Sequence, residues 1–260
     1  MKRYQKVMIG LVALSTMALA VGDETKKFEI CRCNDFSEEC SIPSYSMNVP
    51  SGLAGSAGGG FVALSGITDK HDTDGGLSFG VGYGDSGEKI GGTISVGIGS
   101  IDPVEGGAFN RGALNISAGH SFRDKLIGVA VGMDGINLWH GSDNDHDKSP
   151  SMYLAVTKLV PNDTLPMVFT VGAGNNNFAK VNESGDKKDH IYPFVSGTVY
   201  VMPQVSLIAD YSSDIVSAGV GFVPFPHFPI SFTAGAYDLT KERKEDRVSF
   251  IASACLCFEF

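Results

Sequence analysis

The chain of 260 residues contains no segment of about twenty apolar residues, so it offers no candidate transmembrane helix. Its one short apolar run near the start, Val7 to Leu14, follows a basic stretch, and Ala18-Leu19-Ala20 fits a small-x-small cleavage site. This is the pattern of a secretory signal peptide. No cysteine lies at the cleavage point, which argues against a lipoprotein anchor. We therefore expect residues 1–20 to be a signal peptide that directs export.

Positive charge is also scarce. The 20 Lys and Arg residues are outnumbered by 29 Asp and Glu residues, which gives a formal net charge of -9 at pH 7. Loss of the signal peptide, with its three basic residues, makes the remaining chain more acidic still. This balance argues against nucleic acid as a partner, because phosphate backbones bind basic surfaces. Acidic loops could instead contact lipopolysaccharide through divalent cations.

Tryptophan is almost absent, with one residue, whereas the 33 glycines exceed the roughly 7% that is usual. Glycine and other small residues alternate with apolar ones. In 76–84, Leu77, Phe79 and Val81 interleave with Ser78 and Gly80, which is typical of a membrane-spanning strand with one lipid-facing side. The facing of three segments, 58–67, 151–160 and 191–202, is ambiguous. The twelve expected strands are 58–67, 76–84, 89–100, 112–122, 126–138, 151–160, 167–175, 191–202, 205–212, 215–223, 230–238 and 248–260.

The connections between these segments give an independent check. Those after even-numbered strands are mostly short, such as 123–124 and 203–204, whereas those after odd-numbered strands are mostly longer and more charged, such as 140–150 and 176–190. Membrane β-barrels have short periplasmic turns and longer external loops in this alternation. The sequence therefore predicts an all-β fold, a transmembrane up-and-down antiparallel β-barrel of about twelve strands. Because the number of strands is even, both termini of the chain would lie at the periplasmic side.

The last segment carries a family resemblance. Every second residue from Phe250 onward is apolar, and the series ends with Leu256, Phe258 and Phe260. This ending resembles the C-terminal signature of bacterial outer-membrane β-barrel proteins, and the resemblance covers about residues 58–260. It implies a porin-like barrel in the outer membrane of a Gram-negative bacterium. These three residues would be the insertion signal that the barrel-assembly machinery reads, and the lasting partners would be outer-membrane lipid and lipopolysaccharide.

A second likeness is more local. The run from Asp134 to Trp139, followed by an acidic loop and Ser151-Met152-Tyr153, is similar to a group of uncharacterised barrels of Gram-negative bacteria. That group has no established activity, so it implies fold and location without a substrate.

Residues 21–57 differ from the barrel segments because they lack clean alternation. They include a turn-like stretch at 48–52 and a Ser/Gly-rich approach to the first strand. Three interpretations remain open for this part of the chain: a periplasmic leader, a short cap, or a plug that enters the lumen.

The inward set of the expected strands is small and polar. Few charges belong to it, and the candidates for lumen-facing side chains are Lys89, Ser95, Asp134, Asp210 and Glu259. Large water-filled pores usually carry ladders of charge. A twelve-stranded barrel encloses a narrow lumen, and small side chains leave space in it. The glycines either ease strand curvature, line a narrow pore, or make room for a plug.

The five cysteines all follow the signal peptide and would meet an oxidising periplasm. The disulfide candidates are Cys31, Cys33, Cys40, Cys255 and Cys257. The first three precede the barrel and the last two lie on the final strand, and topology brings both groups to the periplasmic rim. We expect at least one disulfide between them. Zinc bound by four thiolates is the alternative, although no Cys-x-x-Cys spacing supports it.

No catalytic residue, metal site or cofactor is expected. His140-Gly141-Ser142 resembles the His-x-Ser pair of lipid-acting outer-membrane hydrolases, but no third residue is placed to orient the histidine. The alternating aspartates at 143–147 and 69–74 lack the glycine and distal glutamate of an EF-hand loop. We therefore expect a protein that is not an enzyme.

Two functions remain open at this stage. One is a narrow passive channel for small solutes, and the other is a structural or surface-interaction barrel with a closed lumen. The oligomeric state is left undetermined by the sequence.

Overall fold

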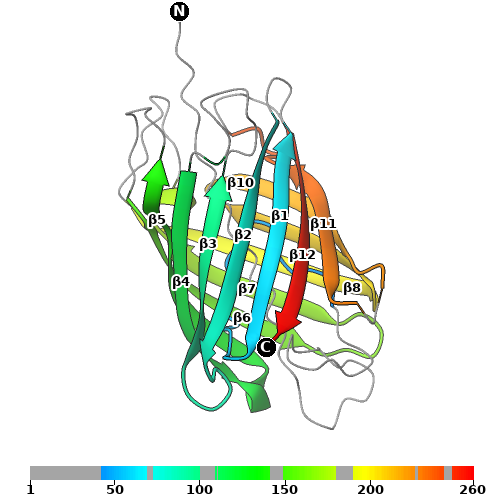
Figure 1. Cartoon of the computed structure of the whole chain (residues 1–260). Coiled ribbons are helices and arrows are strands. Elements are labelled where there is room, and N and C mark those ends of the chain that lie inside the picture. The colour runs from blue at the N-terminus through cyan, green and yellow to red at the C-terminus, as the bar shows by residue number, and fades with distance from the viewer. Residues whose placement is uncertain are drawn as a thin grey trace, which may run out of the picture.

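The computed structural model describes residues 42–68, 73–99, 109, 111–140, 149–179, 190–225, 228–242 and 248–260. Twelve antiparallel strands form one closed barrel in which each strand pairs with its neighbours in sequence and β1 pairs with β12 (Figure 1). The strands are β1 (Gly59–Thr68), β2 (Thr73–Gly84), β3 (Gly91–Gly99), β4 (Arg111–Phe122), β5 (Ile127–His140), β6 (Ser151–Val160), β7 (Met167–Gly174), β8 (Tyr192–Met202), β9 (Val205–Ser212), β10 (Ile215–Phe222), β11 (Ile230–Tyr237) and β12 (Ser249–Glu259). The predicted fold class is confirmed, and no strand boundary differs from the expected one by more than three residues.

The period-2 pattern places apolar side chains on the outside of the wall. Phe79 and Val81 are exposed whereas Ser78 between them is buried, and the same contrast separates Ile94 from Thr93 and Ser95. The strands of ambiguous facing follow the rule. Exposed apolar residues on the outer face include Val62, Leu64, Phe79, Val81, Ile94, Val131, Met152, Leu154, Phe169, Val171, Val195, Leu207, Val220 and Phe222. A wall that is apolar outside and polar inside is the arrangement that a lipid-embedded barrel requires.

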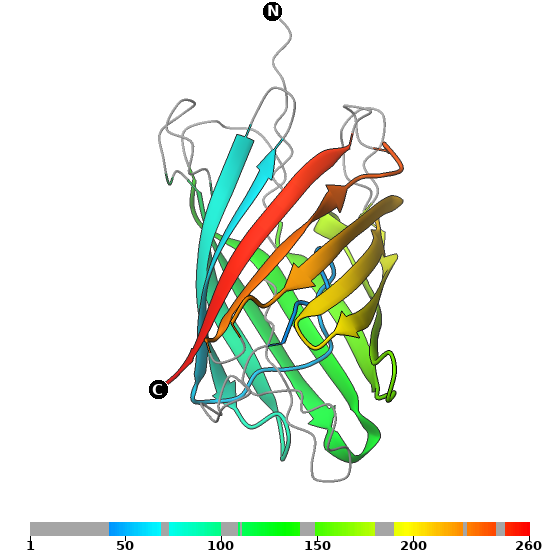
Figure 2. The same cartoon turned by 90° about the vertical axis from the view of Figure 1, so that its right-hand side faces the viewer.

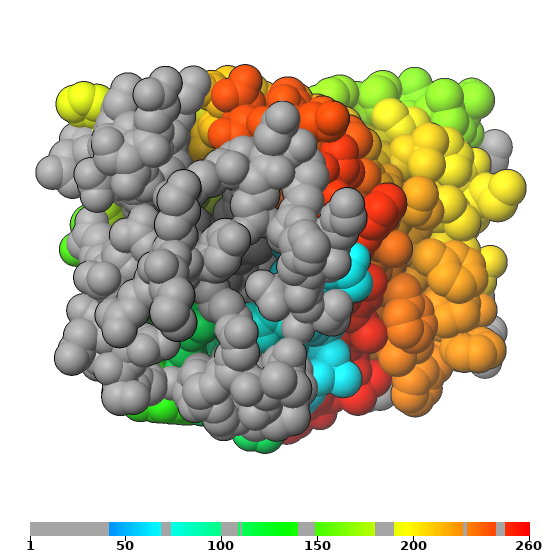
Figure 3. Space-filling view, turned by 90° about the horizontal axis from the view of Figure 1, so that it is seen from above, coloured from blue at the N-terminus to red at the C-terminus, as the bar shows by residue number. Residues whose placement is uncertain are grey.

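The pairing of the first and last strands distinguishes the end of the barrel with short turns from the end with longer loops. Gly59 of β1 is opposite Glu259 of β12, so the first strand begins where the last one ends. The short connections, including 3₁₀ helix η1 (Arg123–Lys125), lie at that same end. The longer connections, including η2 (Asn176–Phe178), lie at the opposite end, which we call the loop end. Figure 3 views the molecule from the loop end, where the atoms of β9 to β12 and of β1 and β2 line one side of the rim.

One irregularity in the wall matters for the interior. The register between β4 and β5 shifts between Leu114 and Ile116, so Asn115 has no opposite partner there. Gly135 adopts a φ of 77°, and its N–H donates to the Asn115 side chain over 2.9 Å. Bulges of this kind bend a strand and redirect side chains. Beyond it, Leu138 and Trp139 are both exposed.

Helices contribute little to this architecture. Within the described ranges, no helix has the length and apolar character needed to cross a membrane.

The outer face yields a first prediction. Val131 lies near the middle of β5 and is 53% exposed. Replacing it by arginine should destabilise the barrel in lipid by about 2–4 kcal/mol, because a charge at the bilayer midplane must be desolvated. Replacing it by leucine, the matched control, should leave stability nearly unchanged. Urea titration of the barrel in vesicles, followed by heat-modifiable gel migration, measures both. Equal stability of the two variants would show that this face does not contact lipid.

Candidate functional site: a chain segment inside the barrel

Residues 42–57, which precede β1, lie within the ring of strands. Figure 2 shows this segment as a blue trace enclosed by the wall. It has no helix or strand structure, yet most of its residues are buried, among them Tyr45, Met47, Val49 and Leu53. Of the three interpretations of residues 21–57, these contacts favour the plug for residues 42–57. Residues 21–41 lie outside the described part of the chain.

The first arm of the segment runs from the short-turn end along β8 and β9. Its backbone carbonyls accept hydrogen bonds from hydroxyl groups of the wall. The Tyr45 carbonyl accepts from Thr198 at 2.6 Å, and the Ser44 carbonyl accepts from Ser206 at 2.5 Å. The Tyr200 hydroxyl donates to the carbonyl of Pro43 over 3.3 Å. Wall hydroxyls therefore satisfy backbone groups that have no ladder partner, as buried polar groups require.

A carboxylate holds the tip of the segment. Asp210, on the inner face of β9, is 3% exposed. Its Oδ2 accepts hydrogen bonds from the backbone N–H groups of Met47 at 2.7 Å and Asn48 at 2.8 Å. The Ser46 hydroxyl lies 3.4 Å from the same oxygen. Bonds to a charged acceptor are about twice as strong as neutral ones, so Asp210 is the main polar anchor of the tip.

The second arm returns to the short-turn end on the other side. The Gly52 N–H donates to the Thr157 hydroxyl of β6 over 2.8 Å. Farther on, the Ser56 and Ser86 hydroxyls lie 2.9 Å apart, and the Ala57 N–H donates to the Gly84 carbonyl. The two described ends of the segment, residues 42 and 57, thus lie toward the same rim, where β1 begins.

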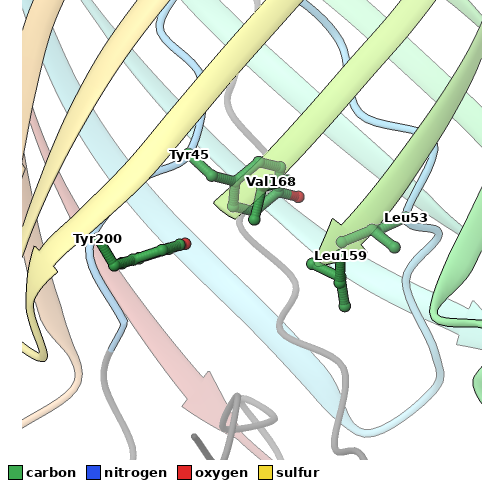
Figure 4. Packing of buried hydrophobic residues seen from close by; sticks show 5 residues of the cluster. All are labelled: Tyr45, Leu53, Leu159, Val168 and Tyr200. Carbon is green, nitrogen blue, oxygen red and sulfur yellow. The ribbon is translucent and has the colours of Figure 1, made fainter. Parts of the chain in front are cut away.

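Apolar packing secures both arms. Tyr45 and Leu53 of the segment form one cluster with Leu159, Val168 and Tyr200, which lie at the short-turn ends of β6, β7 and β8 (Figure 4). Closer to the loop end, Val49 packs in a second cluster whose other members are Ala155, Phe178 and Phe194. The two clusters fill the lumen along β6 to β8.

Glycines of the wall make room for the segment. A Cβ on Gly221 of β10 would lie 2.8 Å from both the N and the O of Ser44, closer than real Cβ atoms approach. Gly52 of the segment and Gly128 of β5 face each other so closely that a Cβ on Gly52 would lie 2.5 Å from the Gly128 carbonyl oxygen. Glycine here permits close backbone approach, which accounts for part of the glycine excess.

The wall from β3 to β5 is different near the loop end. A Cβ on Gly97 would meet no atom of the described residues within 4 Å, and the nearest described atoms to such a Cβ on Gly99 and Gly135 are 3.9 Å away. Polar side chains line this region: the Asn115 amide lies 3.4 Å from the Ser95 hydroxyl, and Asp134 pairs in register with Ser151. We call Ser95, Asn115, Asp134 and Ser151 the polar arc. No described residue of the inserted segment hydrogen-bonds to it.

The predicted lumen-facing residues divide into three groups. Ser95, Asp134 and Asp210 lie on the inner face of the wall, with Ser95 and Asp210 buried. Lys89 is exposed in the turn before β3, so it is a turn residue and not part of the wall. Glu259 is exposed at the last position of β12, at the rim. The Lys89 assignment extended strict alternation past the end of a strand, where it no longer determines facing, whereas Glu259 keeps its place in β12 but lies at the exposed rim.

The structure describes two of the five cysteines of the predicted disulfide. Cys255 is buried and Cys257 is half-buried, opposite Ala63 and Phe61 of β1. Cys31, Cys33 and Cys40 lie outside the described residues, so a disulfide across the rim stays a prediction.

Of the insertion-signal residues, Phe260 is 73% exposed, and its N–H donates to the Gly58 carbonyl.

Sequence reasoning missed the residues that hold the segment. Ser44, Thr157, Thr198 and Ser206 are ordinary members of a small polar inner face, and nothing in their spacing marks them as partners of an inserted loop. A signal was present in Phe194 and Tyr200, two bulky side chains that share the inner face of β8 with Ser196 and Thr198. Catalytic and metal chemistry gained no support: the described ranges hold no group of three His, Cys, Asp or Glu residues placed for a metal, and Gly141 and Ser142 are not among the described residues.

The closed wall, the apolar outer face and the polar interior together decide the class of fold. This is a closed twelve-stranded β-barrel with the apolar outer face and polar interior of a membrane-spanning barrel. No protein-family profile matches the chain, and no curated protein is similar to it in sequence. Among solved structures, the barrel is similar to the NanC porin, at 10% identity and a TM-score of 0.46, over 77% of this chain and all of that one. It is also similar to a chain from a study of the in-meso crystallization of membrane proteins, at 16% identity and a TM-score of 0.44, over 78% of this chain and 84% of that one.

The glycines of the barrel wall provide a prediction. Gly221→Ala places a Cβ against the backbone of Ser44, so we expect a loss of about 1–3 kcal/mol from overpacking. Gly97→Ala makes the same chemical change on the inner face where no atom lies within 4 Å, and it serves as the control. Chemical unfolding in detergent measures both free energies. If the two variants lose the same stability, the segment does not lie against β10.

The anchoring carboxylate of Asp210 provides a further prediction. Asp210→Ala leaves the N–H groups of Met47 and Asn48 without an acceptor, and we expect a loss of about 1.5–3 kcal/mol. Ser212→Ala, two residues further on the same face, removes only a weak contact with Ser213 at 3.5 Å. The same unfolding titration compares the two. A Ser212 variant as unstable as the Asp210 variant would contradict the anchoring role.

Proposed function

We propose that the protein resides in the bacterial outer membrane and forms a narrow passage for small polar solutes, restricted by residues 42–57. The observation that carries the proposal is the unequal filling of the lumen. The segment packs against β6 and β8 to β11, whereas no described atom would lie within 4 Å of a Cβ on Gly97 of β3. A solute would therefore move between the segment and the wall formed by β2 to β5.

The lining fits this kind of solute. Ser95, Asn115 and Ser151 offer hydroxyl and amide groups, and Asp134 is the one carboxylate of the polar arc. Uncharged donors and acceptors replace part of the hydration shell of a polar solute without holding it tightly. Small hydrophilic molecules are the expected cargo, and large or apolar ones are excluded by the narrow space.

The second candidate is a barrel with a closed lumen whose loops contact lipopolysaccharide or other surface molecules. The cluster of Tyr45, Leu53, Leu159, Val168 and Tyr200 favours it, because apolar packing fills the short-turn half of the lumen along β6 to β8. In this case, the inserted segment is structural and the interior does not conduct.

Conductance distinguishes the two. A purified barrel lacking residues 43–54 keeps the contacts of Ala57 and Gly58 that join the segment to the wall. We expect small stepwise openings from the intact protein in a planar bilayer and markedly larger ones from this deletion. An intact protein that is silent, with a deletion that conducts, would identify the closed barrel. The Val131→Leu variant, which changes only the outer face of β5, is the control and should conduct as the intact protein does.

A further inference from the structure

Asp134 is an acid on the inner face of β5 for which the described residues supply no counter-charge. Its Oδ2 is fully enclosed and makes no hydrogen bond in the described structure. The residue as a whole is half-buried, so part of its surface remains accessible. Among the described residues, it forms no ion pair. Asp210, the comparable acid on β9, instead accepts two N–H groups of the inserted segment.

A carboxylate in this position is costly. An ionised group removed from water needs a counter-charge or several hydrogen bonds, or else it takes up a proton. The neighbours of Asp134 are uncharged: Ser151 opposite it, Asn115 across the bulge, and Tyr153 one inward position toward the short-turn end. The Asn115 side-chain oxygen is already used by the Gly135 N–H. None of these described neighbours therefore supplies a counter-charge for Asp134.

The space beside Asp134 is on the side of the loops. Gly135 follows it in the bulge, and Gly97 and Gly99 lie on β3 near the loop end, where a Cβ on any of the three would have no close neighbour. Toward the short-turn end, Tyr153 covers Gly132 and its ring contacts that of Phe178 at a centroid distance of 6.0 Å. An ion would thus reach Asp134 from the loop end and stop above Tyr153.

We propose that Asp134 is a binding site in the lumen for a monovalent cation, either an alkali ion or a small ammonium group, with Ser95, Asn115 and Ser151 around it. A divalent metal is disfavoured because one carboxylate lies here and hard divalent ions take several oxygen ligands, usually with more than one carboxylate. A single negative charge among hydroxyl and amide groups suits one positive charge. The site holds whether or not the barrel conducts.

Protection from chemical labelling tests the site directly. Carbodiimide-mediated amine coupling to the folded, detergent-solubilised protein is followed residue by residue by mass spectrometry, in potassium chloride and in N-methyl-D-glucamine chloride of equal ionic strength. We expect potassium to slow coupling at Asp134 several-fold relative to the bulky cation. Asp74, at the loop end of β2, already accepts the Gly75 N–H at 2.8 Å and serves as the internal control, with equal coupling in both salts. Equal coupling at Asp134 in both salts would overturn the proposal and assign its neutralisation to a proton.

A second measurement relates the site to the passage and rests on the proposed function. Reversal potentials in a potassium chloride gradient are compared for the intact protein, Asp134→Asn and Asp74→Asn. We expect Asp134→Asn to lower the cation-to-anion permeability ratio and Asp74→Asn to leave it nearly unchanged. An intact protein that does not conduct would refute the channel, and the labelling result would then decide the cation site alone.

Discussion

The pairing of β1 with β12 is the constraint on which the rest of this structure depends. Ten residue pairs, from Gly59 opposite Glu259 to Thr68 opposite Phe250, close the sheet on itself. In lipid, every exposed backbone N–H and C=O group costs several kcal/mol, and only closure leaves a sheet with no open edge. Closure also forces each strand to present one face to lipid and the other to the interior, so the apolar and the small polar residues separate.

A second requirement concerns the interior of the closed barrel, where the backbone of the inserted segment needs hydrogen-bond partners. Residues 42–57 have no ladder of their own, so their buried backbone groups need partners from the wall or, as for the Val49 N–H and the Ser46 hydroxyl, from side chains of the segment. Hydroxyl groups of Thr157, Thr198 and Ser206 and the carboxylate of Asp210 supply these partners. Glycines such as Gly221 give the backbone room to approach. The small polar inner face therefore serves two purposes: it holds the segment along β6 and β8 to β11, and it leaves space beside β3 to β5.

Most of the wall could be predicted from the sequence because alternation is a local pattern with one physical cause. The segments 151–160 and 205–212 were predicted with the bounds that the structure has. Alternation no longer determines facing where regular strand pairing stops. Lys89 is in a turn, and the bulge at Asn115 and Gly135 is a pairing irregularity between two strands. The position of residues 42–57 depends on contacts about 105 to 190 residues apart in sequence, such as Gly52 with Thr157 and Ser44 with Thr233. No local pattern encodes such contacts, so the sequence leaves the leader, the cap and the plug open as interpretations of residues 21–57.

The inserted segment is the central claim of this account, and amide hydrogen exchange on the folded barrel tests it most directly. The N–H groups of Met47, Asn48 and Gly52 donate to Asp210 and Thr157 inside the wall, so they should exchange as slowly as the amides of β8 and β9. Exchange of these three amides at the rate of an open chain, with slow exchange retained in β8 and β9, would contradict the account.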